Sequence, residues 1–148
     1  MALSPSDVRW YKTADGSVTS LAHSGVLHDV AASIAVGAST DYTLLALVND
    51  HASLTLSSAV VYLAVGANGV ALAIAKASNG VVGKHDPLES AAASSLTYSS
   101  PTTVGAAISL GSIGPGQAVG VWLRRTASGA TVAAPEINQL IVFGTSPI

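Results

Sequence analysis

The sequence predicts an all-β protein, an antiparallel β-sandwich of the jelly-roll-like or immunoglobulin-like kind, with residues 1–148 forming one domain. Three observations lead to this prediction. Short apolar runs recur along the chain, clusters of Gly, Pro, Asn, Asp and Ser separate them, and almost no segment has helical spacing. Many short strands in this arrangement are typical of a sandwich or barrel. A length of 148 residues fits one domain.

The candidate strands share a short length, an apolar or β-branched composition and flanking turn residues. In chain order they are Val8–Lys12, Val26–Val30, Tyr42–Asn49, Leu54–Leu56, Val60–Val65, Val70–Ala75, Ser95–Tyr98, Ala106–Leu110, Ala118–Arg125 and Ile137–Phe143.

Two segments carry more specific local signals. An Asn-Gly pair at 68–69 separates Val60–Val65 from Val70–Ala75, and this dipeptide favours the tight turn of a β-hairpin. Residues 86–93 are the only stretch with helical character, because Asp86 is a suitable N-cap and Pro87 suits the first helical position. We therefore expect a hairpin at the first segment and a short helix at the second.

The strand predicted at Tyr42–Asn49 is apolar on both faces. Leu44 and Val48 lie on one face, whereas Leu45 and Leu47 lie on the other. In a sandwich only one face of a strand meets the core, so the other face needs a covering loop or a partner subunit. The two alternatives are nearly balanced, with the partner slightly favoured, and Leu45 and Leu47 are therefore candidate interface residues.

The composition restricts the classes of partner and compartment. Charged residues make up only 9% of the chain and apolar residues 49%, which leaves few charges to cover a free monomer, so we expect a homo-oligomer. A net charge of −2 argues against nucleic-acid binding. The longest apolar segment, 59–75, is interrupted at 66–69 and is too short to span a membrane. The N-terminus has neither a basic start nor an apolar run, so we expect no secretion signal.

Catalytic and metal-binding patterns are missing from the sequence. The chain has no cysteine, and its four histidines do not occur at metal-ligand spacing. Three of them, His28, His51 and His85, have an acidic neighbour, but adjacent residues on a strand face opposite ways. There is no Gly-x-Ser-x-Gly motif, and the glycine-rich segment 114–120 leads into a strand rather than a phosphate-binding helix. We expect no enzyme activity, no metal and no cofactor.

The strand that follows this glycine-rich segment carries the densest positive charge. Its alternation directs Val119, Val121 and Leu123 to the core. Trp122 and Arg124 lie on the opposite face and Arg125 at the end of the strand, and these three residues are interface candidates. Trp and Arg are favoured at interface anchors. An arginine stacked over the indole to close the rim of the sandwich is an equally good interpretation.

Several segments together resemble a family of small virion proteins of tailed bacteriophages. The resemblance covers most of the chain, and its specific portion is the Pro-Gly-Gln to Arg-Arg-Thr stretch at 115–126. The segments are Trp10–Ser17, Asp41–Asn49, Leu110–Gln117, Val121–Thr126 and Leu140–Gly144. The resemblance implies a β-rich capsid decoration or cement protein on the capsid surface of the virion, with the major capsid protein as its partner and no catalytic motif.

Two functional hypotheses follow. The first is a structural protein that binds the capsid surface and neighbouring copies of itself. The second is a carbohydrate- or receptor-binding sandwich on a phage fibre or tail, for which Trp10 and Tyr11 form the candidate ligand platform. Trp10 is equally well explained as a core residue of the first strand.

Overall fold

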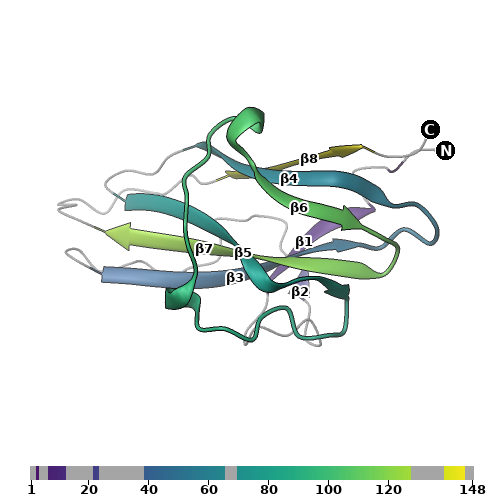
Figure 1. Cartoon of the computed structure of the whole chain (residues 1–148), viewed down its shortest axis with the longest axis horizontal. Helices are drawn as coiled ribbons and strands as arrows, with labels where there is room; N and C mark the ends of the chain where they lie inside the picture. Colours follow the sequence, from purple (N-terminus) through teal and green to yellow (C-terminus); the bar gives the residue numbers. More distant parts are fainter. Residues whose placement is uncertain are drawn as a thin grey trace.

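The computed structural model describes residues 3, 7–12, 22–23, 39–65, 70–127 and 139–145, and the description below concerns these residues. They form antiparallel strands in two sheets, together with two short 3-10 helices, Ala93–Ser95 and Val104–Ala106 (Figure 1). The prediction of an all-β fold is confirmed.

The larger sheet has five strands in the order β2-β1-β3-β7-β5, and the smaller sheet has three in the order β6-β4-β8. The bounds of the larger sheet are β1 Val8–Lys12, β2 Ala22–His23, β3 Ser39–Asn49, β5 Val70–Gly83 and β7 Gln117–Ala127. Those of the smaller sheet are β4 Leu56–Val65, β6 Ile108–Ile113 and β8 Gln139–Thr145.

Most predicted strands have a counterpart in the structure. The first matches β1 at both ends, and those at Tyr42–Asn49 and Ala118–Arg125 lie within the longer β3 and β7. The strand predicted at Val26–Val30 lies outside the described residues. Ser95–Tyr98 is not a strand, although Ser99 immediately after it makes a bridge to Ile74.

The hairpin predicted across residues 66–69 is wrong. β4 pairs with β6 and β8, whereas β5 pairs with β7 in the other sheet. Each strand has an apolar inner face, with Leu63 on β4 and Ile74 on β5 belonging to the same buried cluster. Consecutive strands placed in opposite sheets bury these faces together, which side-by-side pairing in one sheet would not achieve.

The helix predicted at 86–93 is also wrong. The segment is irregular, and only Ala93–Ser95 forms a 3-10 turn. The Glu89 carboxylate accepts hydrogen bonds from the backbone N–H groups of Ser90 and Ala91 at 2.9 and 2.8 Å. These bonds satisfy the two N–H groups without a helix. Side chains that bond to the nearby backbone in this way compete with helix formation.

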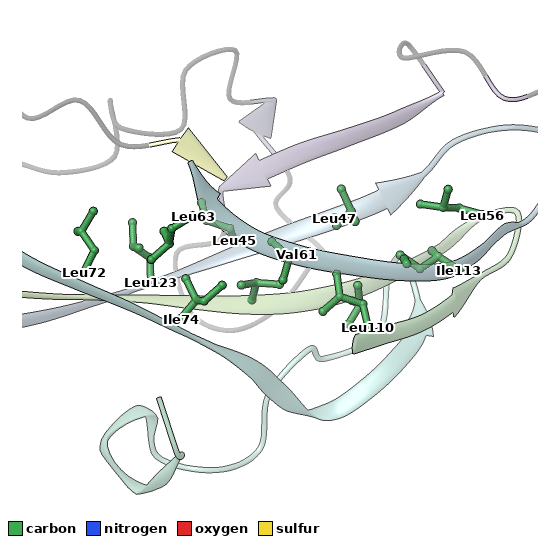
Figure 2. Close-up of a cluster of buried hydrophobic side chains, with 13 residues drawn as sticks. Leu45, Leu47, Leu56, Val61, Leu63, Leu72, Ile74, Leu110, Ile113 and Leu123 are labelled. Carbon is green, nitrogen blue, oxygen red and sulfur yellow. The ribbon is translucent and has the colours of Figure 1, made fainter. Parts of the chain in front are cut away.

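An inner cluster of buried side chains takes residues from both sheets (Figure 2). The predicted core residues Val119, Val121 and Leu123 belong to it and are at most 3% exposed. The inner cluster is defined by Leu45, Leu47, Leu56, Ala59, Val61, Leu63, Leu72, Ile74, Leu110, Ile113, Val119, Val121 and Leu123.

A second, outer cluster lies on the opposite face of the five-stranded sheet. It consists of Leu44, Ala46, Val48, Ala77, Leu88 and Ala118. Leu88 comes from an irregular stretch that we call the covering segment, residues 84–103. It is fully buried, so the second apolar face of β3 is covered by a loop of the same chain. Of the two alternatives left open by the sequence, the covering loop is the correct one.

The covering segment then passes the outer edge of β5 and reaches the smaller sheet (Figure 1). The backbones of Ser99 and Ile74 exchange two hydrogen bonds of 2.8 and 3.0 Å. The Leu63 N–H donates to the carbonyl of Pro101 at 2.8 Å, which attaches the same segment to β4. The covering segment therefore links the two sheets along one side.

Candidate functional site

Leu45 and Leu47 are core residues, and their assignment to an interface was wrong. Their exposed fractions are 0% and 1%, and both belong to the inner cluster. The alternation of β3 therefore directs Leu45 and Leu47 toward the second sheet.

Arg125 is likewise not a surface residue, since only 4% of it is exposed. It is separated from Leu123 by one residue, so the two share the inner face of β7. Its backbone is opposite Asp41 in the pairing of β3 with β7. The position at the end of the strand does not make the side chain accessible, because the strand continues to Ala127.

Trp122 faces outward as predicted, but it is half-buried and already bonded within the chain. It packs against the outer cluster. Its indole N–H donates to Glu89 Oε2 at 2.9 Å. Trp122 therefore holds the covering segment on the sheet, a role that the sequence does not reveal because Glu89 lies on another segment.

Glu89 is the centre of a local hydrogen-bond network. Besides Trp122, its carboxylate accepts bonds from the backbone N–H and hydroxyl of Ser78 and from the N–H groups of Ser90 and Ala91. Burial raises the pKa of the Glu89 carboxyl, but the bonds from Ser78, Ala91 and Trp122 outweigh it and lower the pKa to about 2. The carboxylate is therefore ionised throughout the neutral range.

Trp10 and Tyr11 do not lie on one face, so they do not form the shared ligand platform that the sequence suggested. Trp10 packs against the inner cluster and Tyr11 against the outer one, because neighbouring residues of β1 face opposite ways. The Tyr11 hydroxyl donates to Asp50 Oδ2 at 2.8 Å, and Lys84 Nζ lies 3.2 Å from Asp50 Oδ1. Burial raises the pKa of Tyr11, and the bond to Asp50 raises it further.

The contacts of Asp50 also show how this residue is placed relative to its neighbour His51. Burial raises the pKa of Asp50, but its bonds to Tyr11 and Lys84 outweigh this and lower it. His51 turns away, and its Nδ1 accepts the N–H groups of Ser53 and Leu54 at 3.0 and 2.9 Å. Asp50 and His51 therefore do not form a catalytic pair.

The glycine-rich segment before β7 is a turn, as its composition indicates. The N–H of Gln117 bonds to the carbonyl of Gly114 at 3.1 Å, and Gly116 has a φ of +69°. A type II turn requires a positive φ at its third residue, here Gly116, and proline is common at its second residue, here Pro115. Buried Asn49 donates to the carbonyl of Ile113 at 2.9 Å and fixes the approach to this turn.

The remaining candidate, Arg124, is half-buried and lies in a group of polar and aromatic residues in which Thr40 and Tyr42 are exposed. We call this group the Tyr42 patch; it comprises Thr40, Tyr42, Tyr98, Arg124 and Thr126. Tyr42 is opposite Arg124 in the pairing of β3 with β7, and Thr40 is opposite Thr126. Alternation places all four on the outer face of the sheet, in the rows next to the outer cluster.

Arg124 stacks on a tyrosine and not on the indole that the sequence suggested. Its Cζ lies 4.7 Å from the centre of the Tyr98 ring, a cation–π geometry. The rings of Tyr42 and Tyr98 are 5.7 Å apart and inclined by 51°. Tyr42 is 37% exposed, so its ring is accessible beside the guanidinium.

Tyr98 supports this arrangement from the covering segment. Its hydroxyl donates to the carbonyl of Ala93 at 2.9 Å. Burial raises the pKa of Tyr98 to about 12, so the ring under Arg124 is neutral at ordinary pH. Sequence reasoning missed Tyr98 because it approaches Arg124 only after the covering segment has folded back over the sheet.

Other kinds of site have no support among the described residues. No group of three or more His, Asp or Glu side chains in this part of the chain could hold a metal ion. Within the same residues, no helix is long and apolar enough to cross a membrane. No protein-family model, curated protein or solved structure matches the chain.

Proposed function

We propose that the chain is a non-enzymatic structural protein of a tailed-phage virion that binds the capsid surface, through the major capsid protein, and neighbouring copies of itself. The sequence resemblance supports this assignment, and the two-sheet architecture agrees with the β-rich component that it implies. As part of the same proposal, the two sheets form a β-sandwich within one domain, and the buried cluster that takes residues from both sheets supports this.

The Tyr42 patch is the observation that carries a binding role. It combines an exposed tyrosine with an arginine supported on a second ring. Tyrosine and arginine are enriched among the residues that contribute most to protein interfaces. The covering segment already hides the apolar outer cluster, so on the outer face of the sheet a partner can reach this patch but not the apolar strand residues beside it.

Many identical weak contacts can hold such a protein on a shell. Burial of apolar surface stabilises a contact by roughly 25 cal/mol per Å2, and linked copies bind more tightly than separate ones. The low charge content of 9% favours contacts of this kind between copies.

The proposal is tested by mixing the purified protein with undecorated capsids of the phage that encodes it and sedimenting the mixture. We expect saturable binding, and roughly tenfold weaker binding for Tyr42→Ala or Arg124→Ala. Arg9→Ala, at an exposed arginine outside the patch, is the control and binds as the unchanged protein does. The absence of saturable binding would exclude the proposal, while equal binding by all variants would exclude the patch as its interface.

A second candidate function is a recognition module on a fibre or tail. The observation that favours it is the exposed ring of Tyr42, flanked by the hydroxyls of Thr40 and Thr126, which lie 3.4 Å apart. Carbohydrate sites combine such rings with hydroxyl partners. A specific signal on a glycan array, lost in Tyr42→Ala, would favour this function over capsid binding.

A further inference from the structure

We propose that Arg124 binds the carboxylate of an acidic side chain on the partner protein. The inference rests on the proposed function in one respect: it takes the Tyr42 patch as the surface that faces a partner. It adds the chemistry of the group that this surface receives.

The guanidinium of Arg124 has its hydrogen-bond donors available. Within the described residues its contact is with the face of the Tyr98 ring, and it makes no hydrogen bond or ion pair there. A guanidinium carries five N–H donors, and no hydrogen bond among the described residues uses any of those of Arg124.

The Glu89 carboxylate, which lies close enough to Tyr98 for its charge to act on that ring, is already engaged. It accepts bonds from Ser78, Ser90, Ala91 and Trp122. An acidic group from another molecule would therefore meet no competitor from Glu89.

The geometry favours a planar, singly charged group. A carboxylate can accept two parallel bonds from one guanidinium, which gives direction as well as attraction. Tyr98 holds the guanidinium in place, and a group that is already oriented loses less freedom when it binds. Tyr42, Thr40 and Thr126 surround it with neutral groups that suit the polar rim of a protein interface.

The patch does not suit a nucleic acid or an anionic polysaccharide. Binding to such polymers needs several cations along one path. Lys76 shares its side of β5 with the inner-cluster residue Ile74, so it lies on the face away from Arg124. Of the described residues that form the patch, Arg124 alone carries a charge.

The test is an NMR titration of the isotope-labelled protein with a six-residue glutamate peptide. We expect shifts centred on Tyr42, Tyr98 and Arg124, and binding that weakens as salt rises. Arg124→Gln should lower the affinity roughly tenfold and Arg124→Lys by a smaller factor, because lysine keeps the charge but loses the paired geometry. Arg9→Gln is the control and keeps the affinity.

Several outcomes would overturn the inference. Chemical-shift changes centred away from Arg124 when the unchanged protein is titrated with the peptide would overturn it. Equal affinity of the Arg124→Gln variant would do so too, as would equal or tighter binding of an oligonucleotide or heparin fragment at the patch. The same variants are sedimented with undecorated capsids. If the unchanged protein and Arg124→Gln bind capsids equally well, the carboxylate site is wrong and capsid binding stands. If the peptide binds at Arg124 but neither the unchanged protein nor any variant binds capsids, the proposed function is wrong and the carboxylate site stands.

Discussion

The two faces of the five-stranded sheet are buried in different ways. On the inner face, large aliphatic side chains such as Leu45, Val121 and Ile74 meet residues of the second sheet. On the outer face, the sheet offers mainly small residues such as Ala46 and Ala118, and a single segment of irregular chain lies over them. The inner face thus relies on regular strand packing, whereas the outer face relies on one loop and the polar bonds that hold it.

Gly120 shows how tightly the outer face is packed, both by the sheet itself and by the covering segment. A Cβ added there would lie 2.7 Å from Ala77 Cβ and 3.2 Å from Leu88 Cβ. Ala77 comes from the four residues of β5 that bulge between Lys76 and Val81, where the pairing with β7 shifts. The absence of a side chain at position 120 therefore makes room for both the bulge of β5 and Leu88 of the covering segment.

The largest expected effect tests the inner face. Leu45→Ala should lower the free energy of unfolding by about 3 kcal/mol, because a fully buried leucine leaves a cavity. Val104→Ala, at a residue 57% exposed, is the control and should change it by less than about 0.5 kcal/mol. Denaturant unfolding of both variants measures the difference. If Leu45→Ala were as stable as the control, Leu45 would not be a core residue.

A smaller effect tests the outer face. Gly120→Ala should cost about 1–3 kcal/mol, because the added methyl group overpacks the contact with Ala77 and Leu88. Gly105→Ala is a matched control, since nothing lies within 4 Å of a Cβ at that position.

The place where Gly120→Ala acts can be measured by hydrogen exchange. We expect faster exchange at the amides of Ser99 and Leu63, whose bonds attach the covering segment to the sheets. Exchange in the centre of β3 should change less. Uniform acceleration through both sheets would show that the two faces do not differ in this way.

The contrast between the faces also explains which features the sequence could predict. Alternation in β7 identified Val119, Val121 and Leu123 as core, because a strand repeats every two residues and the inner cluster follows that repeat. The covering segment has no repeat, and the contacts of Leu88, Glu89 and Tyr98 depend on a loop folding back.

Two errors of interpretation have related causes. The Asn-Gly pair indicates a tight turn, but the sheet to which each flanking strand belongs depends on contacts distant in the sequence, so β4 and β5 lie in different sheets. At the candidate site, Arg124 was found by its charge and its face, whereas Tyr42 and Tyr98 required the strand register and the loop. Local patterns thus predicted strands and faces but not their partners.

The smallest expected effect concerns the polar bonds of the covering segment. Glu89→Gln should lower the free energy of unfolding at pH 7 by about 1 kcal/mol, because the amide has one acceptor oxygen for donors that now share two. The indole N–H signal of Trp122, one of two tryptophans in the chain, should shift in the variant. Ser94→Ala, at an exposed residue of the same segment, is the control and leaves that signal in place.

The difference in the free energy of unfolding between the unchanged protein and Glu89→Gln should depend on pH, which gives an independent check. The pKa of Glu89 is about 2 in the folded protein and 4.5 as its ordinary value, so the carboxylate contributes stability above pH 4.5 that is lost as the pH falls toward 2. The free energy of unfolding of the unchanged protein should therefore fall more steeply over this range than that of Glu89→Gln, and the two values should converge at low pH. Asp50 titrates in both proteins, so the difference between them isolates Glu89. A gap that stayed constant from pH 7 to pH 2 would show that the ionised carboxylate does not hold the covering segment, and the outer face would then depend on Leu88 packing alone.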